Sequence, residues 1–286
     1  MEMLKGNKRV KRRGQALTTL AMAFVSFLWI LPVVAGVLTS FKSGLEVKQF
    51  SQYKNLIPRQ WTLENYKFVL SYPALPVARL LMNTILVCAV CVGFTLVLCS
   101  MSAYAFERFD FSNKEVLFWT LFSLSAIPNV VALVPQYSMY TQLGWIDKLP
   151  SIIAPNLTSV FSIFLIRQFM RGIPRELDEA ARIDGANEFS IFVRIMVPLI
   201  FPVLTLVAIF QFSDIWNDFL WPSIAITTPS NTTITAALRL LNDATGVRVE
   251  RALAGCVLAI IPTLAIFVVF RKWFMKGLDI GSGLKG

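Results

Sequence analysis

Six blocks of mainly apolar residues, separated by shorter polar or charged segments, constrain the fold of this chain more than any other feature. A helix needs about 20 apolar residues to cross the hydrocarbon core of a bilayer, and the blocks are close to this length. Inside a bilayer every backbone polar group must be bonded within the protein, which favours helices. We therefore predict an all-α integral membrane protein with six transmembrane helices.

The predicted segments follow one another along the chain. Residues 1–16 form a basic N-terminus, 17–38 the first transmembrane helix and 39–76 an outer loop. The membrane core occupies 77–271, and its helices are expected at about 77–101, 116–140, 151–169, 195–220 and 252–270. Within this core, 171–194 is a charged cytoplasmic loop, and 272–286 is a cytoplasmic tail. Pro128 and Pro135 predict kinks in the third helix, because proline lacks a backbone N–H.

The distribution of basic residues predicts the orientation. Seventeen of the 27 lysines and arginines lie in the N-terminus, the tail and the segments that share their side of the membrane. Since basic residues concentrate on the cytoplasmic side, both termini are expected in the cytoplasm. The net charge of +10 is then explained by orientation in the lipid bilayer, and no nucleic-acid partner is predicted.

Several kinds of chemistry are disfavoured by the residues present. The chain has no histidine, the commonest general base and metal ligand, and no G-x-x-x-x-G-K-[ST] loop for ATP. Cys88 and Cys91 have C-x-x-C spacing, but they lie in an unbroken apolar run with no second pair nearby. We interpret them as small apolar residues of a membrane helix. No catalytic residue, metal site or cofactor of the chain itself is predicted.

The segment 174–202 is densely charged for so apolar a chain and is built like a short helix with marked ends. Pro174 suits a first helical position, and the carboxylates that follow it suit a first turn. Gly185 suits the left-handed conformation that often ends a helix. One face of this helix is predicted to carry Leu177, Ala180, Ala181 and Asp184. Composition alone also fits a solvated linker, but we predict a helix that docks on another protein in the cytoplasm.

The spacing of this segment resembles a known family pattern. Glu179-Ala180-Ala181, three residues, Gly185, nine residues, Ile195, one residue and Val197-Pro198 resemble the EAA loop of bacterial ABC importer membrane subunits. That pattern is EAA-x3-G-x9-I-x-L-P, and Val197 stands where it has leucine. The chain is also similar to the carbohydrate-uptake branch of this family, and within it to the maltose-type second permease. This similarity covers nearly the whole chain and is carried by the segments 174–186, 216–222 and 61–66 and by the tail, which is one residue longer than the family pattern.

The resemblance implies a type I ABC importer permease fold in the bacterial inner or plasma membrane. It implies a heterodimer with a second homologous permease, two cytoplasmic ATPase subunits that bind ATP and Mg²⁺, and an extracytoplasmic sugar-binding protein. The chain itself would not be an enzyme. By this likeness Glu179 and Asp184 face basic groups of the ATPase, Ala180 and Ala181 permit close packing, and Gly185 forms the turn.

The substrate path is less defined by the sequence. Asp214, Trp216, Asn217 and Asp218 lie late in the fifth predicted helix, near its outer end. Carboxylates in membrane helices usually face protein or water, and an aromatic face beside polar groups suits a sugar. Tryptophan is also common at membrane interfaces, and in maltose-type pairs the sugar contacts lie mainly on the other permease. Either a sugar path or gate, or a structural role in capping or packing, fits these residues.

Three other kinds of protein share some of these sequence features. A permease for glycerol-3-phosphate or a polyol shares the same motifs, although a phosphate would favour arginines deep in the path. A carrier driven by an ion gradient would favour internal repeats and midplane charges, neither of which is evident. An enzyme embedded in the membrane is disfavoured by the missing histidine and by the lack of clustered carboxylates.

Overall fold

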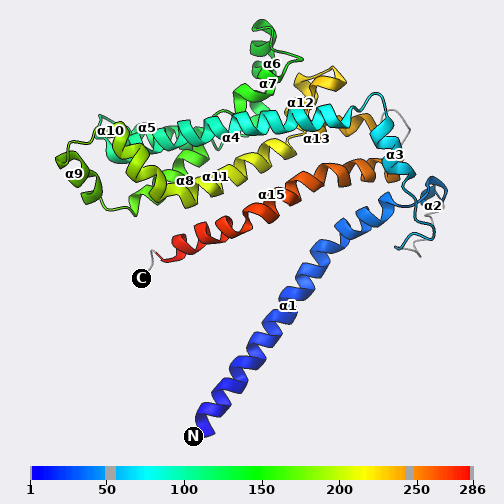
Figure 1. The fold of residues 1–286 in the computed structure, drawn as a ribbon, viewed down its shortest axis with the longest axis horizontal. Helices are drawn as coiled ribbons and strands as arrows, with labels where there is room; N and C mark the ends of the chain where they lie inside the picture. The colour runs from blue at the N-terminus through cyan, green and yellow to red at the C-terminus, as the bar shows by residue number, and fades with distance from the viewer. Residues whose placement is uncertain (1, 49–55, 242–247, 284–286) are drawn as a thin grey trace. The chain divides into compact units, whose positions relative to one another are not determined.

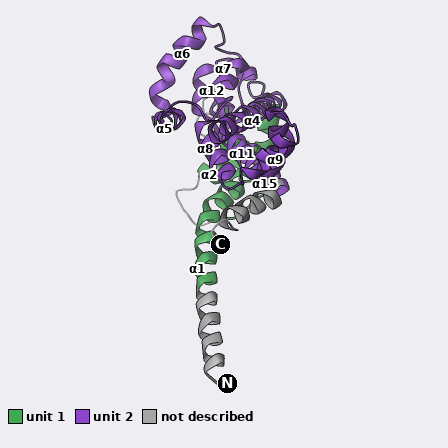
Figure 2. Ribbon diagram, turned by 90° about the vertical axis from the view of Figure 1, so that its left-hand side faces the viewer, with its two compact units in different colours: residues 1–71, 241–258 green, residues 72–240, 259–286 purple. Residues whose placement is uncertain are grey.

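The computed structural model describes residues 2–48, 56–241 and 248–283, and all secondary structure in these ranges is helical. Residues 49–55 of the predicted outer loop and the last three residues of the predicted tail lie outside this description. The chain forms two compact units, which are described separately: residues 1–71 with 241–258, and residues 72–240 with 259–286 (Figure 2).

The apolar helices confirm the prediction of an all-helical, multi-pass membrane protein. Five of them, in the described residues, are long and apolar enough to cross a bilayer: Thr18–Ser40, Val77–Arg108, Leu149–Arg171, Glu188–Asn217 and Val249–Val269. A sixth crossing would come from two shorter helices that meet at an angle of 86°. The number of spans is therefore five or six, in agreement with the apolar blocks of the sequence.

The first unit contains the long helix α1, two short helices and the start of another long helix. Its elements are α1 (Glu2–Ser40), α2 (Gly44–Lys48), α3 (Glu64–Ser71) and the start of α15 (Val249–Gly283). Asn65 donates its side-chain amide to the carbonyls of Ser40 and Lys42, at 2.8 Å each. Carbonyls at a helix end have no partner within the helix, so Asn65 supplies one. The segment 61–66, which contains Asn65, thus caps α1.

The core of the second unit is formed by α4 (Val77–Arg108), α8 (Val160–Arg171) and α11 (Val197–Asn217). These three helices lie side by side and bury a common apolar cluster (Figure 1). At one end of the bundle the cluster is closed by α9 (Glu176–Ile183), α10 (Glu188–Ile191) and a π-helical turn over Phe192–Met196. The charged segment singled out in the sequence is therefore packed on the membrane core.

The third predicted span is broken in two. Instead of one kinked helix over 116–140, the chain forms α5 (Lys114–Leu124), a short 3₁₀ turn and α6 (Leu133–Gln142). Pro128 stands at the break, directly before the 3₁₀ turn Asn129–Ala132. Pro135 lies in the first turn of α6, where its missing N–H removes no helical bond. One of the two predicted kinks is therefore a sharp break, and the other is absent.

The fourth span is interrupted as well, and side chains of neighbouring helices form hydrogen bonds with the backbone of its non-α-helical stretch. It consists of α7 (Leu149–Ile153), a 3₁₀ turn over Ala154–Asn156 and, after an irregular stretch, α8. The carbonyl of Asn156 accepts from Gln211 Nε2 at 2.9 Å and from Thr95 Oγ1 at 3.4 Å. Irregular backbone at membrane depth is tolerated where protein groups satisfy it.

Two thiols of α4 complete these contacts. Cys91 Sγ donates to the carbonyl of Ile153 at 3.6 Å, and Cys99 Sγ lies 3.5 Å from the carbonyl and 3.4 Å from the amide nitrogen of Ser159. With Thr95, these residues recur every four positions and share one face of α4. Cys88 and Cys91 are buried free thiols, as the sequence indicated, but Cys91 also bonds backbone.

At the other end of this unit, one carboxylate ties two loops together. Asp147 has a positive φ of 64°, and its oxygens accept from the amides of Thr227 and Thr228 at 2.9 and 2.7 Å. The hydroxyl of Thr228 also donates to it at 2.5 Å. The bond from this hydroxyl is the main cause that holds the pKa of Asp147 below its ordinary value. The loop before α7 is thereby fixed to the segment after α12 (Leu220–Ala225).

Replacement of Gln211 by leucine removes a donor to the interrupted span at similar volume. We expect the Gln211→Leu protein to lose about 1–3 kcal/mol of stability, because the half-buried Asn156 carbonyl keeps only its longer bond to Thr95. Thermal unfolding in detergent measures this loss. Thr205→Val is the matched control, since Thr205 bonds only the carbonyl of its own helix four residues earlier. Equal stability of the two variants would contradict this role of Gln211.

The contacts of Asp147 predict a pH dependence of the loops that it joins. Because its folded pKa is lowered, the stabilisation is present above the ordinary value of 3.8 and is lost as the pH falls through the lowered pKa. As the pH falls through this pKa, the rate of hydrogen exchange at the Thr227 and Thr228 amides, corrected for intrinsic rates, should rise by roughly threefold. The increase is this small because Asp147 is partly exposed and solvent screens its charge. Asp147→Asn should show that faster exchange at every pH, while tolerating the positive φ.

Candidate functional site

The predicted docking helix exists as α9, which begins two residues later than expected. Pro174 precedes the helix, and Glu176 is its first residue. After Asp184, Gly185 has a positive φ of 82°. Its amide donates to the carbonyl of Arg182 at 3.0 Å, and the amide of Ala186 donates to that of Ala181 at 2.9 Å. The glycine that ends the helix is thus confirmed, with the bonding typical of a left-handed terminus.

One narrow stripe of α9 faces the bundle and the rest is exposed. Asp178 and Ala181, three residues apart, are both buried. Glu179, Ala180 and Asp184 are exposed, and Ile183 is 87% exposed. The helical spacing predicts that Ala181 shares a docking face with Leu177, Ala180 and Asp184, and for Ala181 this prediction is wrong. Its small side chain packs in the core cluster of its own chain, since the turn at Gly185 brings this side of α9 against α8 and the π-helical turn.

An ion pair anchors the buried stripe. Arg108, the last residue of α4, places Nε 2.7 Å from Oδ2 of Asp178, and the two side chains are 3% and 2% exposed. Burial raises the pKa of the Asp178 carboxyl above its ordinary value, although the guanidinium groups of Arg108 and Arg182 act in the opposite direction. Removal of the arginine would leave a buried carboxylate without its counter-charge, which is costly.

A second cluster of charges lies where α8 meets α4 and α5. Arg167 is buried, donates to Glu107 at 3.2 Å and bonds Glu115, and its guanidinium lies 4.1 Å from the ring centre of Phe118. Arg171 reaches the same Glu107 oxygen at 3.2 Å. These arginines were counted for orientation in the sequence analysis, which missed their partners. The sequence did contain a signal of these ion pairs, because Glu107 and Glu115 lie between the second and third predicted helices, on the same side of the membrane as the two arginines.

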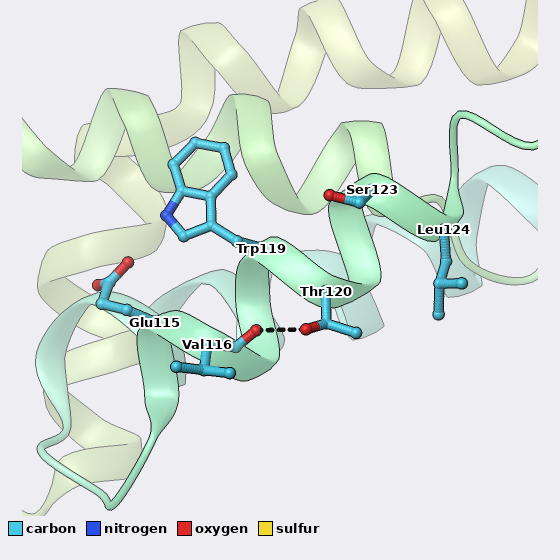
Figure 3. Close-up of a pocket in the computed structure, with 6 residues that line it drawn as sticks. All are labelled: Glu115, Val116, Trp119, Thr120, Ser123 and Leu124. Atoms are coloured by element: carbon cyan, nitrogen blue, oxygen red, sulfur yellow. Dashed lines mark hydrogen bonds between the residues drawn. The ribbon is translucent and has the colours of Figure 1, made fainter.

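Glu115 also borders a groove along α5. The other residues that line it are Val116, Trp119, Thr120, Ser123 and Leu124 (Figure 3). Thr120 points its hydroxyl back to the carbonyl of Val116, and the indole of Trp119 extends over the helix surface (Figure 3). The lining is mostly apolar, as expected of a surface that meets lipid or another membrane protein.

The second half of the EAA-like pattern marks a backbone irregularity. Residues Phe192–Met196 form a π-helical turn that ends two residues before Pro198. Proline has no N–H for the carbonyl four residues earlier, and its ring crowds that carbonyl, so a widened turn fits there. The fifth span therefore runs without interruption from Glu188 to Asn217, and it starts earlier than the predicted residue 195.

The four residues proposed for the substrate path do not act as one group. Trp216 is buried and donates its indole N–H to the carbonyl of Ala259 at 3.0 Å. Asp218 accepts from the amide of Trp221 at 3.3 Å and so caps α12. Asn217 is exposed and donates to the carbonyl of Ser213 at 2.8 Å, and Asp214 is exposed one turn before the end of α11. Trp216 and Asp218 thus have structural contacts, and Asp214 and Asn217 remain on the surface of α11.

The comparison with known families agrees with this geometry. Residues 3–280 match the family described as the binding-protein-dependent transport system inner membrane component. The chain belongs to this family. It is a multi-pass permease of the inner membrane, and the resemblance of its EAA-like loop is confirmed. Membership also argues against a carrier that works alone on an ion gradient.

Similar proteins cover nearly the whole permease. It is 30% identical to the arabinooligosaccharide permease AraQ of Halalkalibacterium halodurans, over 94% of this chain and 96% of AraQ. It is 32% identical to the glucose import permease GlcU of Saccharolobus solfataricus, over 93% and 94%. The sn-glycerol-3-phosphate permease UgpE of Rhizobium meliloti is 34% identical, over 78% of this chain and 82% of UgpE.

A solved structure supports the fold. The crystal structure of a bacterial ABC transporter involved in the import of alginate contains a chain that superposes with a TM-score of 0.79 and 21% identity. The superposition covers 93% of this permease and 98% of that chain. The permease therefore has the type I importer fold that the resemblance implied.

Gly185 allows a test of the turn that ends α9. An added Cβ would meet no atom within 4 Å, so any effect of a side chain comes from the positive φ. We expect Gly185→Val to lower stability by at least about 1–2 kcal/mol, the cost of the left-handed region for an L-residue, whereas Gly185→Asn is tolerated. Thermal unfolding in detergent provides the measurement. Gly93→Ala in α4, which also has open space around it, serves as control. Full stability of Gly185→Val would contradict a strained turn.

Proposed function

We propose that this permease is one of two membrane subunits of an ATP-driven importer of sugars or oligosaccharides, and that α9 couples it to a cytoplasmic ATPase. The observation that carries the coupling proposal is the division of α9 into two faces. Asp178 and Ala181 hold the helix on the bundle, while a mainly exposed surface with Glu179, Ala180 and Asp184 remains for a partner. A helix built only as a linker would not need such an anchorage.

The exposed surface suits a cleft with basic and apolar walls. Glu179 and Asp184 supply carboxylates for basic groups of the ATPase, and such charge-assisted bonds are stronger than neutral ones. Ala180 permits close approach, and Ile183, which the sequence analysis did not select, supplies an apolar anchor. ATP and Mg²⁺ are bound by the ATPase in this scheme, and a second homologous permease brings its own docking helix to a second ATPase copy.

Sugar is the substrate class that we favour. AraQ and GlcU carry sugar names, and a binding protein that delivers the sugar from outside fits the family description. Glycerol-3-phosphate is the alternative substrate, because the similar protein UgpE is named as its permease. Against a phosphate, the buried Arg167 is already bonded to Glu107 and Glu115, so its charge is compensated. Asp214 and Asn217, exposed on α11, are the side chains that we assign to a sugar path or gate.

Purification and charge reversal together test this function. The permease, tagged and extracted from its native membrane in mild detergent, should bring an ATPase and a second permease with it. Glu179→Lys should insert normally but lower sugar uptake by about tenfold or more, because it places like charges in the docking cleft. Asp110→Lys, an exposed charge reversal in the loop before α5, is the control and should leave uptake unchanged. Normal uptake by Glu179→Lys would refute docking through α9.

A further inference from the structure

One face of α4 holds the coupling helix near both of its ends. Tyr104 and Arg108 are four residues apart on α4, and both are buried. Arg108 forms the ion pair with Asp178 in the first turn of α9. Tyr104 donates its hydroxyl to Glu188 Oε2 at 2.9 Å, and Glu188 accepts at its other oxygen from Arg182 Nε, in the last turn of α9, at 2.6 Å. Glu188 is therefore a bridge between α4 and the end of α9.

The turn that leads into α9 is bonded to the end of α4 in both directions. Arg108 Nη2 donates to the carbonyl of Ile173 at 2.9 Å. In return, Arg175 Nη2 donates to the carbonyl of Glu107 at 3.0 Å. Two consecutive residues of α4 thus hold the residues on both sides of Pro174. A displacement of α9 away from α4 would break all of these contacts together.

The ion pair between Arg108 and Asp178 is unusual because stability alone does not require it. A buried pair loses the hydration of both charges, and apolar replacements of similar volume are often as stable. The pair lies beside an aromatic cluster, in which Tyr104 packs against Phe109 and Phe192 at 5.5 and 5.3 Å. Each buried charge must stay close to the other, so the pair holds α9 in one orientation, which aromatic packing alone would not specify.

We propose that Asp178 is a positioning residue of the importer, which with Arg108, Tyr104 and Glu188 joins α9 and α4 into one rigid lever. The proposal rests on the proposed docking of α9 on an ATPase. A movement of the ATPase then displaces α4, whose other residues Cys91, Thr95 and Cys99 bond the interrupted fourth span. When one partner of the pair is removed and the other is left unpaired, α9 still docks, but its movement is taken up by the loop and ATP hydrolysis is no longer matched by transport.

The experiment uses the whole importer, purified and reconstituted in liposomes with its binding protein and sugar. The measured quantity is sugar transported per ATP hydrolysed, together with the amount of ATPase retained on the permease. The variants are Asp178→Asn, Arg108→Gln and the double variant, which replaces the ion pair by two neutral amides. Asp110→Asn is the matched control, because it removes a carboxylate from an exposed ion pair with Lys114 on the same side of the bundle.

Each single variant should retain the ATPase and lower transport per ATP by about tenfold, because one charge loses its buried partner. The double variant should recover most of this ratio, and Asp110→Asn should equal the unaltered importer. An unchanged ratio in both single variants overturns the proposal, and so does a double variant that is no better than either single one. If the unaltered importer itself retains no ATPase, the proposed function fails, which this comparison separates from a failure of the lever.

Tyr104→Phe keeps the test decisive where the charge variants do not assemble. It removes the hydroxyl that bonds Glu188 and leaves the aromatic packing in place. Transport per ATP should fall by about threefold with full retention of the ATPase, as for a single bond to a charged group that is partly exposed to solvent. A ratio equal to that of the unaltered importer would overturn the lever.

Discussion

The structure depends on one constraint, which is that backbone polar groups at membrane depth must be bonded within the protein. A continuous α-helix is the simplest way to meet this constraint, but the fourth span is not continuous, because its backbone is not α-helical between Ile153 and Val160. Its carbonyls are then bonded from α4 and α11, by thiols, a hydroxyl and an amide. These bonds tie the span that contains α8 to α4 and α11, and the three helices form the core of the second unit.

The end of the bundle that carries α9 uses charge where its interior uses small polar groups. Arginines of α4 and α8 reach carboxylates and carbonyls on neighbouring elements, so that Glu107 alone receives Arg167 and Arg171 and, through its carbonyl, Arg175. Charge-assisted bonds of this kind are directional and fix orientation as well as distance. Some of the basic residues from which we predict the orientation of the chain in the membrane therefore also position α9. A single compositional feature has two physical consequences.

Much of the fold could be predicted from the sequence because it follows from local rules. Apolar blocks predict spans, carboxylates and glycine mark the ends of α9, and the spacing from Glu179 to Pro198 predicts the family. The orientation of α9 could not be predicted, because an eight-residue helix has several plausible inner faces and the choice depends on Arg108, 70 residues earlier in the chain. The four-residue spacing of Cys91, Thr95 and Cys99 was visible, but its partners are carbonyls, which leave no trace in the sequence.

The placement of Ala181 shows why the orientation of α9 matters for the proposed function. In the EAA-like pattern Ala180 and Ala181 are adjacent, and adjacent helical residues point in different directions. Ala180 is exposed beside Glu179, whereas Ala181 packs into the core beside Asp178. The small size of Ala181 lets α9 approach its own bundle, and in the docking that we propose Ala180 lets the ATPase approach α9 from outside. With the ATPase docked on its outer face, as we propose, α9 would be in close contact on both sides and would have little freedom to move independently, so a force on that face would be transmitted to the membrane helices.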